Sequence, residues 1–277
     1  MPCLKCSLSK KSVTLISEEK TLENGMSIWA LADTHLAFGV PEKSMDLRFP
    51  AWVDYTKRIK ENWDKCIQAD DLVLIPGDIS WAMTLDEALV DLKWIDALPG
   101  TKVILKGNHD YWWPSHNKLV KVLPKSIHLI DKEPFHWNNV SIGGARLWDT
   151  SELSFTPYIH FEKEPKAAAT TEEELAEKLE RDEKIFQREL LRLKTSLSKL
   201  NPEAEHRIAM THFPPISADL QPSKASALLE EFNINISIFG HLHSVKNKVS
   251  LFGEKNGVRY ILTAADYLNF FPINILH

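Results

Sequence analysis

The chain has 277 residues and a hydrophobic content of 44%, which is enough to bury one large core, so we expect a single domain with an insertion. A formal net charge of −5 argues against a general nucleic-acid-binding protein, because it provides no broad cationic surface. The three cysteines are too few for a disulfide framework, and no stretch approaches the roughly 20 apolar residues of a membrane span, so we expect a cytoplasmic protein.

The first 25 residues are polar and show no periodic pattern, whereas Met26 stands directly before the first apolar run. We predict a polar, disordered leader over residues 1–25 and a folded domain over residues 26–277. A chain that begins at Met26 should therefore keep its activity and its stability. A clear loss of either one, in enzyme assays or in urea denaturation, would contradict this prediction.

Six short apolar runs alternate with stretches of helical periodicity, which indicates an α/β fold whose sheets are covered by helices. The runs occupy residues 28–32, 72–75, 102–105, 140–143, 208–210 and 236–239. Residues 51–69 carry apolar side chains with a 3.6-residue period and predict a helix. Residues 245–252 and 258–263 flank a turn at 253–257 and predict a β-hairpin.

Two further helices are predicted from their start signals. Thr84 and Glu87 have the spacing of a capping box, and Thr171 and Glu174 repeat it before the longest helix, which runs to about residue 198. The apolar stripe of that helix favours packing on its own sheet over a coiled-coil dimer. Residues 147–200 are therefore predicted to be a helical insertion, in a position where substrate selection often resides.

Asp, Asn and His residues follow five of the apolar runs directly. The clusters are Asp33 and His35, then Gly77-Asp78, then Gly107-Asn108-His109-Asp110, then His212, and finally His241 and His243. Each cluster alone is weak evidence, because a strand-end Asp is often a turn former. Ligands of open α/β sheets bind beyond the carboxyl ends of the strands, so the five clusters together predict one metal site with nitrogen and oxygen donors.

The order of these clusters resembles that of the calcineurin-like metallophosphoesterase superfamily, over residues 33–243. Residues 107–113 and 266–270 are similar to an uncharacterised bacterial phosphohydrolase branch of it. The resemblance implies an α/β fold: a four-layer α/β/β/α sandwich of two mixed β-sheets flanked by helices.

The resemblance also implies two divalent metal ions, which would be Mn, Fe or Zn. One ion would be held by Asp33, His35, Asp78 and His243. The other would be held by Asp78, Asn108, His212 and His241. Asp78 would bridge the ions through its two separate oxygens.

In the mechanism that the resemblance implies, the ions activate a water molecule to hydroxide, which attacks phosphorus in line. His109 would be the general acid that protonates the leaving alkoxide. Asp110 would orient His109 and raise its pKa. Arg146, Tyr111 and Trp112 are candidate substrate contacts, although a surface ion pair for Arg146 and core packing for both aromatic residues explain them as well.

The substrate is expected to be a small-molecule phosphoester, whose identity the sequence does not determine. A phosphoprotein phosphatase is disfavoured, because Ile79, Ser80 and Trp81 replace the expected Val-Asp-Arg segment after Gly-Asp. A sugar-nucleotide pyrophosphatase typically carries Arg at the position of His109, which weakens that alternative. The alternative from another functional class is a non-catalytic scaffold or interaction protein on the same fold. Such a protein would have no physical need of seven metal ligands and a general acid, which argues for an enzyme.

Overall fold

Two mixed β-sheets form the centre of the molecule in the computed structural model, which describes residues 25–160, 171–246 and 251–277. The leader predicted over residues 1–25 therefore lies outside the described residues, except for Gly25. The first sheet has the order β11 (Ile273–Leu276), β1 (Ile28–Ala30), β2 (Leu72–Pro76), β3 (Thr101–Leu105) and β4 (Ile127–Leu129). The second has the order β5 (Phe135–Trp137), β6 (Val140–Ala145), β7 (His206–Thr211), β8 (Ile236–Phe239), β10 (Val258–Leu262) and β9 (Gly253–Lys255).

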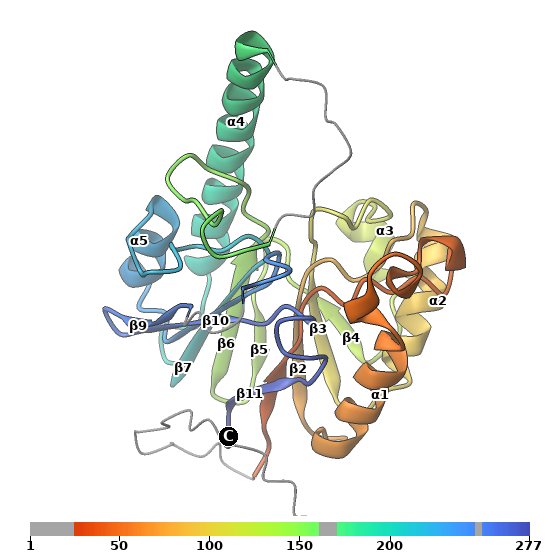
Figure 1. Ribbon diagram of the computed structural model, residues 1–277. Helices are drawn as coiled ribbons and strands as arrows, with labels where there is room; N and C mark the ends of the chain where they lie inside the picture. Colours follow the sequence, from red (N-terminus) through yellow and green to blue (C-terminus); the bar gives the residue numbers. More distant parts are fainter. Residues whose placement is uncertain (1–24, 161–170, 247–250) are drawn as a thin grey trace, which may run out of the picture.

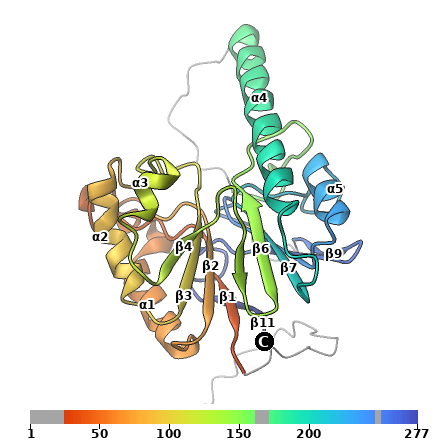
Figure 2. The same cartoon turned by 180° about the vertical axis from the view of Figure 1, so that it is seen from behind.

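Helices cover the outer face of each sheet, as Figures 1 and 2 show from opposite sides. The first sheet is covered by α1 (Tyr55–Cys66), α2 (Leu85–Asp96) and α3 (His116–Val120), and the second by α4 (Glu172–Leu197) and α5 (Lys224–Glu231). Three separate apolar clusters fill the interfaces: one between each sheet and its helices, and one between the two sheets. The predicted four-layer sandwich is thus confirmed.

Both predicted capping boxes are present in the structure. Thr84 accepts a hydrogen bond from the backbone N–H of Glu87 at the start of α2, and Thr171 does the same for Glu174 at the start of α4. The first helix is shorter than the predicted 51–69, because a short 3₁₀ turn at Pro50–Trp52 precedes it and α1 begins only at Tyr55.

The predicted hairpin is present, but its first strand and its turn were placed wrongly. The strand that pairs with β10 is β9, which begins at Gly253, and residues 247–250 of the predicted strand lie outside the described residues. The turn lies at Asn256 and Gly257, whose φ angles are 51° and 80°. An Asn-Gly pair with two positive φ angles favours a tight two-residue turn, so the chain reverses there and Gly253 is free to join the strand.

Helix α4 belongs to the outer layer over only part of its length. Its C-terminal half packs on β6, where the Ser196 hydroxyl accepts a 3.0 Å hydrogen bond from the backbone N–H of Gly144. Its N-terminal half projects beyond the body of the molecule, and Leu175 and Leu179 are half exposed there (Figure 1). The prediction that this helix packs on its own sheet is therefore confirmed only for its C-terminal half. No helix within the described ranges is both long enough and apolar enough to cross a bilayer.

Candidate metal centre

The loops after β1 and β2 run side by side and carry three of the predicted ligands. The backbone N–H of Asp33 donates to the carbonyl oxygen of Gly77, and that of His35 donates to the carbonyl oxygen of Asp78, both at 3.0 Å. These bonds continue the parallel pairing of the two strands beyond their carboxyl ends. Asp33, His35 and Asp78 are therefore held next to one another, with exposures of 1% or less.

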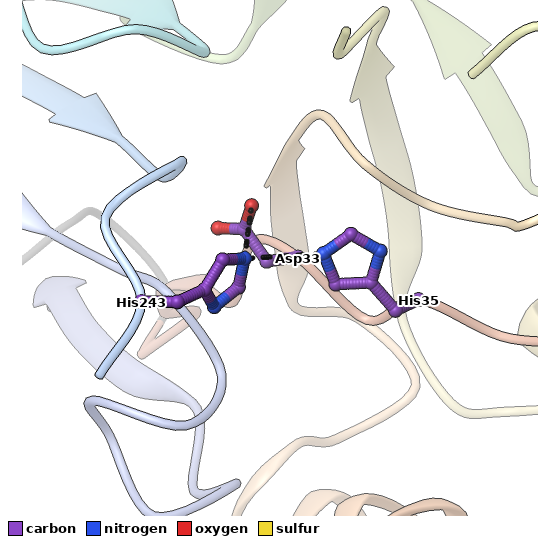
Figure 3. A group of neighbouring side chains, drawn as sticks. All are labelled: Asp33, His35 and His243. Atoms are coloured by element: carbon purple, nitrogen blue, oxygen red, sulfur yellow. Dashed lines mark hydrogen bonds and ion pairs between the residues drawn. The ribbon is translucent and has the colours of Figure 1, made fainter. Parts of the chain in front are cut away.

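The first group of ligands consists of Asp33, His35 and His243. The Nε2 atom of His243 lies 3.5 Å from Asp33 Oδ1 and 3.1 Å from His35 Nε2. Figure 3 shows these three side chains converging from the loop after β1 and the loop after β8. Three donor atoms so close together match the geometry of ligands that share one cation.

The second group is centred on the amide oxygen of Asn108. This Oδ1 atom lies 2.7 Å from His212 Nε2 and 3.1 Å from His241 Nδ1. His212 Nδ1 lies 3.0 Å from the carbonyl oxygen of Pro76, which can only accept, so Nδ1 carries a proton. Nε2 is therefore the nitrogen that faces Asn108 and Asp78 and that a cation would use.

Asp78 lies between the two groups. Its Oδ2 atom is 3.8 Å from His35 Nε2 and 3.4 Å from His212 Nε2, and it is buried without a hydrogen-bond partner among the described residues. Its Oδ1 atom accepts a 2.8 Å bond from the backbone N–H of His109. The expectation that Asp78 uses a separate oxygen for each ion is therefore corrected, because one oxygen faces both groups and the other is bonded to the backbone.

This donor set fits a pair of divalent cations. A buried carboxylate oxygen without a partner costs free energy, and a cation at that place would remove the cost. Zn–N and Zn–O bonds of about 2.0–2.2 Å place neighbouring ligand atoms about 3 Å apart, and the separations of 2.7 to 3.8 Å between the donor atoms agree with this. Neutral imidazole and carboxylate donors suit Mn, Fe or Zn.

Burial and charge set the protonation of these histidines. Burial lowers the pKa of His35 to about 3, so its ring is neutral and can donate a lone pair. Burial also disfavours the charged form of His212, but the adjacent Asp78 outweighs this and raises the pKa to about 9. In the metal-free protein that proton neutralises the carboxylates, so metal binding at this place would displace it.

Four of the seven ligands have left-handed backbone conformations. The φ angles are 56° at Asp33, 42° at His35, 52° at Asp78 and 70° at His241. Such angles cost about 1–3 kcal/mol each in residues other than glycine, and they persist where the surrounding structure enforces them. The strain is concentrated where the side chains must be aimed at one point, which supports a functional role for this place.

Two glycines allow the loops to approach one another. A Cβ atom at Gly77 would lie 2.5 Å from His212 Nδ1, and one at Gly240 would lie 2.1 Å from Asp33 Oδ2. Neither contact is sterically possible without displacing a ligand side chain. The absence of a side chain at Gly77 and Gly240 is therefore what lets these loops lie so close together.

Asp266 is a candidate positioning residue that the sequence analysis did not single out. Its Oδ1 atom accepts a 2.8 Å bond from His243 Nδ1, which leaves Nε2 of that ring facing Asp33. Its Oδ2 atom accepts a 2.9 Å bond from the backbone N–H of Ser244. A carboxylate that fixes the tautomer of a ligand histidine is a recurrent feature of metal sites. The available signal was its place shortly after the last predicted strand.

His109 lies beside the two ligand groups and is enclosed by aromatic rings. Its ring centroid is 4.6 Å from that of Trp81 and 6.0 Å from that of Tyr111, and Trp81 also stacks on His35 at 4.8 Å. Burial lowers the pKa of His109, and its Nδ1 atom is buried without a partner among the described residues.

The expectation that Asp110 orients His109 is corrected by the structure. The Asp110 carboxylate accepts four bonds, all from other groups, and is fully buried. The donors are the backbone N–H groups of Ile79 at 2.9 Å, Ser80 at 3.2 Å and Gly107 at 2.8 Å, and the indole N–H of Trp112 at 3.0 Å. Asp110 therefore ties the loop after β2 to the loop after β3.

We expect Asp110→Ala to lower the free energy of unfolding by about 3 kcal/mol, because several buried donors lose their acceptor at once. Urea denaturation of the two proteins measures this difference. An unchanged midpoint of urea denaturation would contradict the role of Asp110 in holding the two loops together. If the acid limb of the pH–rate profile also shifted, Asp110 would again be a candidate partner of His109.

The three candidate substrate contacts have different surroundings. Trp112 is only 3% exposed and bonds to Asp110, so it is a packing residue and its assignment as a substrate contact is corrected. Tyr111 is 57% exposed beside His109 and remains available to a ligand. Arg146 lies 3.6 Å from Glu189 Oε1, with its guanidinium 4.5 Å above the ring of Trp148.

A cavity of about 580 Å³ opens beside the second ligand group. His241 lines it together with Trp148, Phe155 and Phe213, and Leu179 contributes from the projecting half of α4. The predicted insertion therefore supplies part of the wall of a cavity next to a ligand histidine. The wall combines these aromatic side chains with polar ones such as Asp149 and Lys178, a mixture that suits a small organic molecule with polar groups.

One solved structure in particular has a similar fold. The chain is 16% identical to the phosphopantetheinyl hydrolase of Mycobacterium tuberculosis, with a TM-score of 0.53 over 90% of this chain and 95% of that one. It is 15% identical to a protein of unknown function from Aquifex aeolicus, with a TM-score of 0.42 over 90% and 95% of the two chains.

A curated relative is the Gene 66 protein of Mycobacterium phage D29, 32% identical over 84 residues, which are 30% of this chain and 40% of the phage protein. The alignment thus spans well under two thirds of that relative. Residues 26–245, by contrast, match the family model of the calcineurin-like phosphoesterases, and they include all seven ligand positions. The chain therefore belongs to the calcineurin-like phosphoesterase family.

Proposed function

We propose that this protein hydrolyses a phosphoester of a small molecule, with two divalent cations at the candidate metal centre and His109 as general acid. Membership of the phosphoesterase family supports phosphoester hydrolysis in general. The observation that carries the dinuclear form is the Oδ2 atom of Asp78, which is buried, unpartnered among the described residues and directed at both ligand groups. An oxygen in that position is expected of a ligand shared by two ions.

In this proposal, Asp33, His35 and His243 hold one cation, and Asn108, His212 and His241 hold the other, with Asp78 shared. When bound, such a pair supplies a water of lowered pKa and neutralises the charge of the phosphoryl oxygens. The protein's part is to keep the donors rigid. Asp266 fixes the His243 ring, and the Pro76 carbonyl fixes the His212 ring.

His109 would provide the proton for the leaving oxygen. Its backbone N–H is anchored on Asp78 Oδ1, so the ring stays beside the ligand groups. The rings of Trp81 and Tyr111 limit its movement and exclude water from one side. A group held in this way can protonate an alkoxide as the ester bond breaks, which contributes about 10²–10⁴-fold for poor leaving groups.

The test combines metal analysis with a substrate panel. The purified chain should contain about two transition-metal ions after reconstitution with Mn, and it should hydrolyse aryl phosphate monoesters or diesters only when metal is present. The panel adds cyclic nucleotides, sugar nucleotides and phosphopeptides, so that the substrate class can be compared directly. A chain that binds no metal and hydrolyses none of these compounds would instead fit a non-catalytic scaffold.

A further inference from the structure

Three arginines surround one buried carboxylate near the end of β6. Glu189 of α4 is 1% exposed, and its Oε1 atom lies 2.7 Å from a guanidinium nitrogen of Arg192. The same oxygen lies 3.6 Å from Arg146 and 3.6 Å from Arg188. One carboxylate oxygen cannot satisfy three guanidinium groups, each of which carries five N–H donors. Most of their hydrogen-bonding capacity is therefore left for another acceptor.

Lys106 adds a fourth positive charge to this cluster. It follows β3 directly and is half-buried, and within the described part of the chain its ammonium group has no hydrogen bond or close ion pair. Arg146, Arg192 and Glu189 are among the charges that act on it. Repulsion between like charges costs free energy, which an anion would recover.

The four cations together carry far more positive charge than their surroundings neutralise. We call Lys106, Arg146, Arg188 and Arg192 the basic cluster. Glu189 is the only carboxylate that contacts it within ion-pair distance in the described ranges, and the nearby Asp110 already accepts four bonds. The whole chain, by contrast, has a formal net charge of −5. A local surplus of this size in an acidic protein is typical of a binding site for an anion.

The basic cluster adjoins the loops of the metal centre. The carbonyl oxygen of Arg146 accepts bonds from the backbone N–H groups of His212 at 3.1 Å and Phe213 at 3.0 Å. Lys106 stands two residues before Asn108. A ligand at the metal centre can therefore reach the basic cluster with a second group.

The positions of the guanidinium groups also suit recognition of a ligand. The side chains of Arg188 and Arg192 are 56% and 52% exposed, so their heads reach solvent, while the buried Glu189 fixes one edge of each. The guanidinium of Arg146 is further held against the ring of Trp148 at 4.5 Å. Arginine heads fixed in this way lose little conformational entropy when they form bidentate bonds to a phosphate.

We propose that the basic cluster binds a second phosphate group of the substrate, one that is not cleaved, so that the preferred substrates are organic bisphosphates or related polyanions. This inference rests on the proposed phosphoester hydrolysis at the metal centre. Hydrolysis of the first ester would take place among the metal ligands, while the second phosphate would orient the molecule and increase its affinity.

The test compares two ligands that differ only in the second phosphate, adenosine 3′,5′-bisphosphate and adenosine 5′-monophosphate. Both would be measured as competitive inhibitors of aryl phosphate hydrolysis by the full chain. We expect the bisphosphate to bind about 10- to 100-fold more tightly, because charge-assisted hydrogen bonds from arginine to phosphate are among the strongest that proteins form. The ratio of the two inhibition constants should fall toward one in Arg192→Ala and in Lys106→Ala.

A matched control is Lys184→Ala, which removes an exposed lysine of the same helix that is paired with Glu180. This variant should keep the preference for the bisphosphate. Equal inhibition constants in the wild-type chain, or a preference that survives in both Arg192→Ala and Lys106→Ala, would overturn the inference. Aryl phosphate hydrolysis in the same assays shows separately whether the proposed function holds.

If the chain hydrolyses no aryl phosphate, the proposed function fails on its own. Isothermal titration of the two nucleotides into the same protein then decides the question of the basic cluster. Tighter binding of the bisphosphate that is lost in Arg192→Ala would support an anion site without hydrolysis, and equal binding of the two nucleotides would refute it.

Discussion

Replacement of Asp78 by alanine is expected to reduce kcat/KM for phosphoester hydrolysis by about a thousandfold or more, and to remove at least one bound metal ion per chain. The reason is that Asp78 Oδ2 faces both ligand groups, so its loss weakens both sites at once. Metal content would be measured by mass spectrometry after reconstitution, and hydrolysis with an aryl phosphate.

Asp266→Asn is the control variant for this prediction, because a smaller loss of metal affinity is expected from it. Asp266 bonds to His243 through Nδ1, the nitrogen that faces away from Asp33, so its replacement should weaken metal affinity by about 10- to 100-fold without abolishing binding. Circular dichroism would verify that both variants fold. An Asp78→Ala protein that retains two ions and most of its activity would show that Asp78 is not a shared ligand.

Replacement of His109 by alanine should reduce kcat by about 10²–10⁴-fold for alkyl phosphates, whose leaving groups have high pKa values. The loss should be much smaller for 4-nitrophenyl phosphate, because its leaving group departs without a proton. The two substrates would be compared in the same metal-loaded preparations. Metal content should be retained, since in the structure the ring of His109 lies beside the donor groups while its backbone N–H holds Asp78 Oδ1.

A natural control for this experiment is Tyr111→Phe. Tyr111 is the exposed neighbour of His109, and the substitution keeps the ring while it removes the hydroxyl group. It should leave the dependence on the leaving group unchanged. If His109→Ala lost equal activity with both classes of ester, His109 would be a positioning residue for substrate or metal, and the general acid would have to be sought elsewhere.

The strands that end at the metal centre were predictable because their composition leaves few alternatives. Residues 72–75 and 208–210 are continuously apolar, and residues 236–239 are apolar except for Ser237, as is typical of strands buried on both faces. All three runs are completely or almost completely buried in the structure. The capping boxes at Thr84 and Thr171 were equally local signals. Short elements such as β4, β5 and α3 carry three to five residues each, which is too few for a periodic pattern to emerge.

The hydrogen-bonding roles of the charged residues were less predictable. Asp110 follows His109 in the sequence, and adjacency suggested an orienting partner. In the folded chain its carboxylate faces the backbone of a neighbouring loop instead. Asp266 lies far from the other motif residues in sequence, yet it bonds directly to His243. Contacts of this kind depend on the path of the loops in three dimensions.

The sequence by itself determined which residue types stand at the strand ends, and hence the family, the layered fold and the identity of the seven candidate ligands. These follow from local composition and order along the chain. Only the tertiary structure decided which oxygen of Asp78 faces both ligand groups, which carboxylate orients His243, and that Arg146 meets the arginines around Glu189. The physical reason is that hydrogen bonds and charge interactions act over a few ångströms in space, between residues that may be two hundred positions apart in the chain.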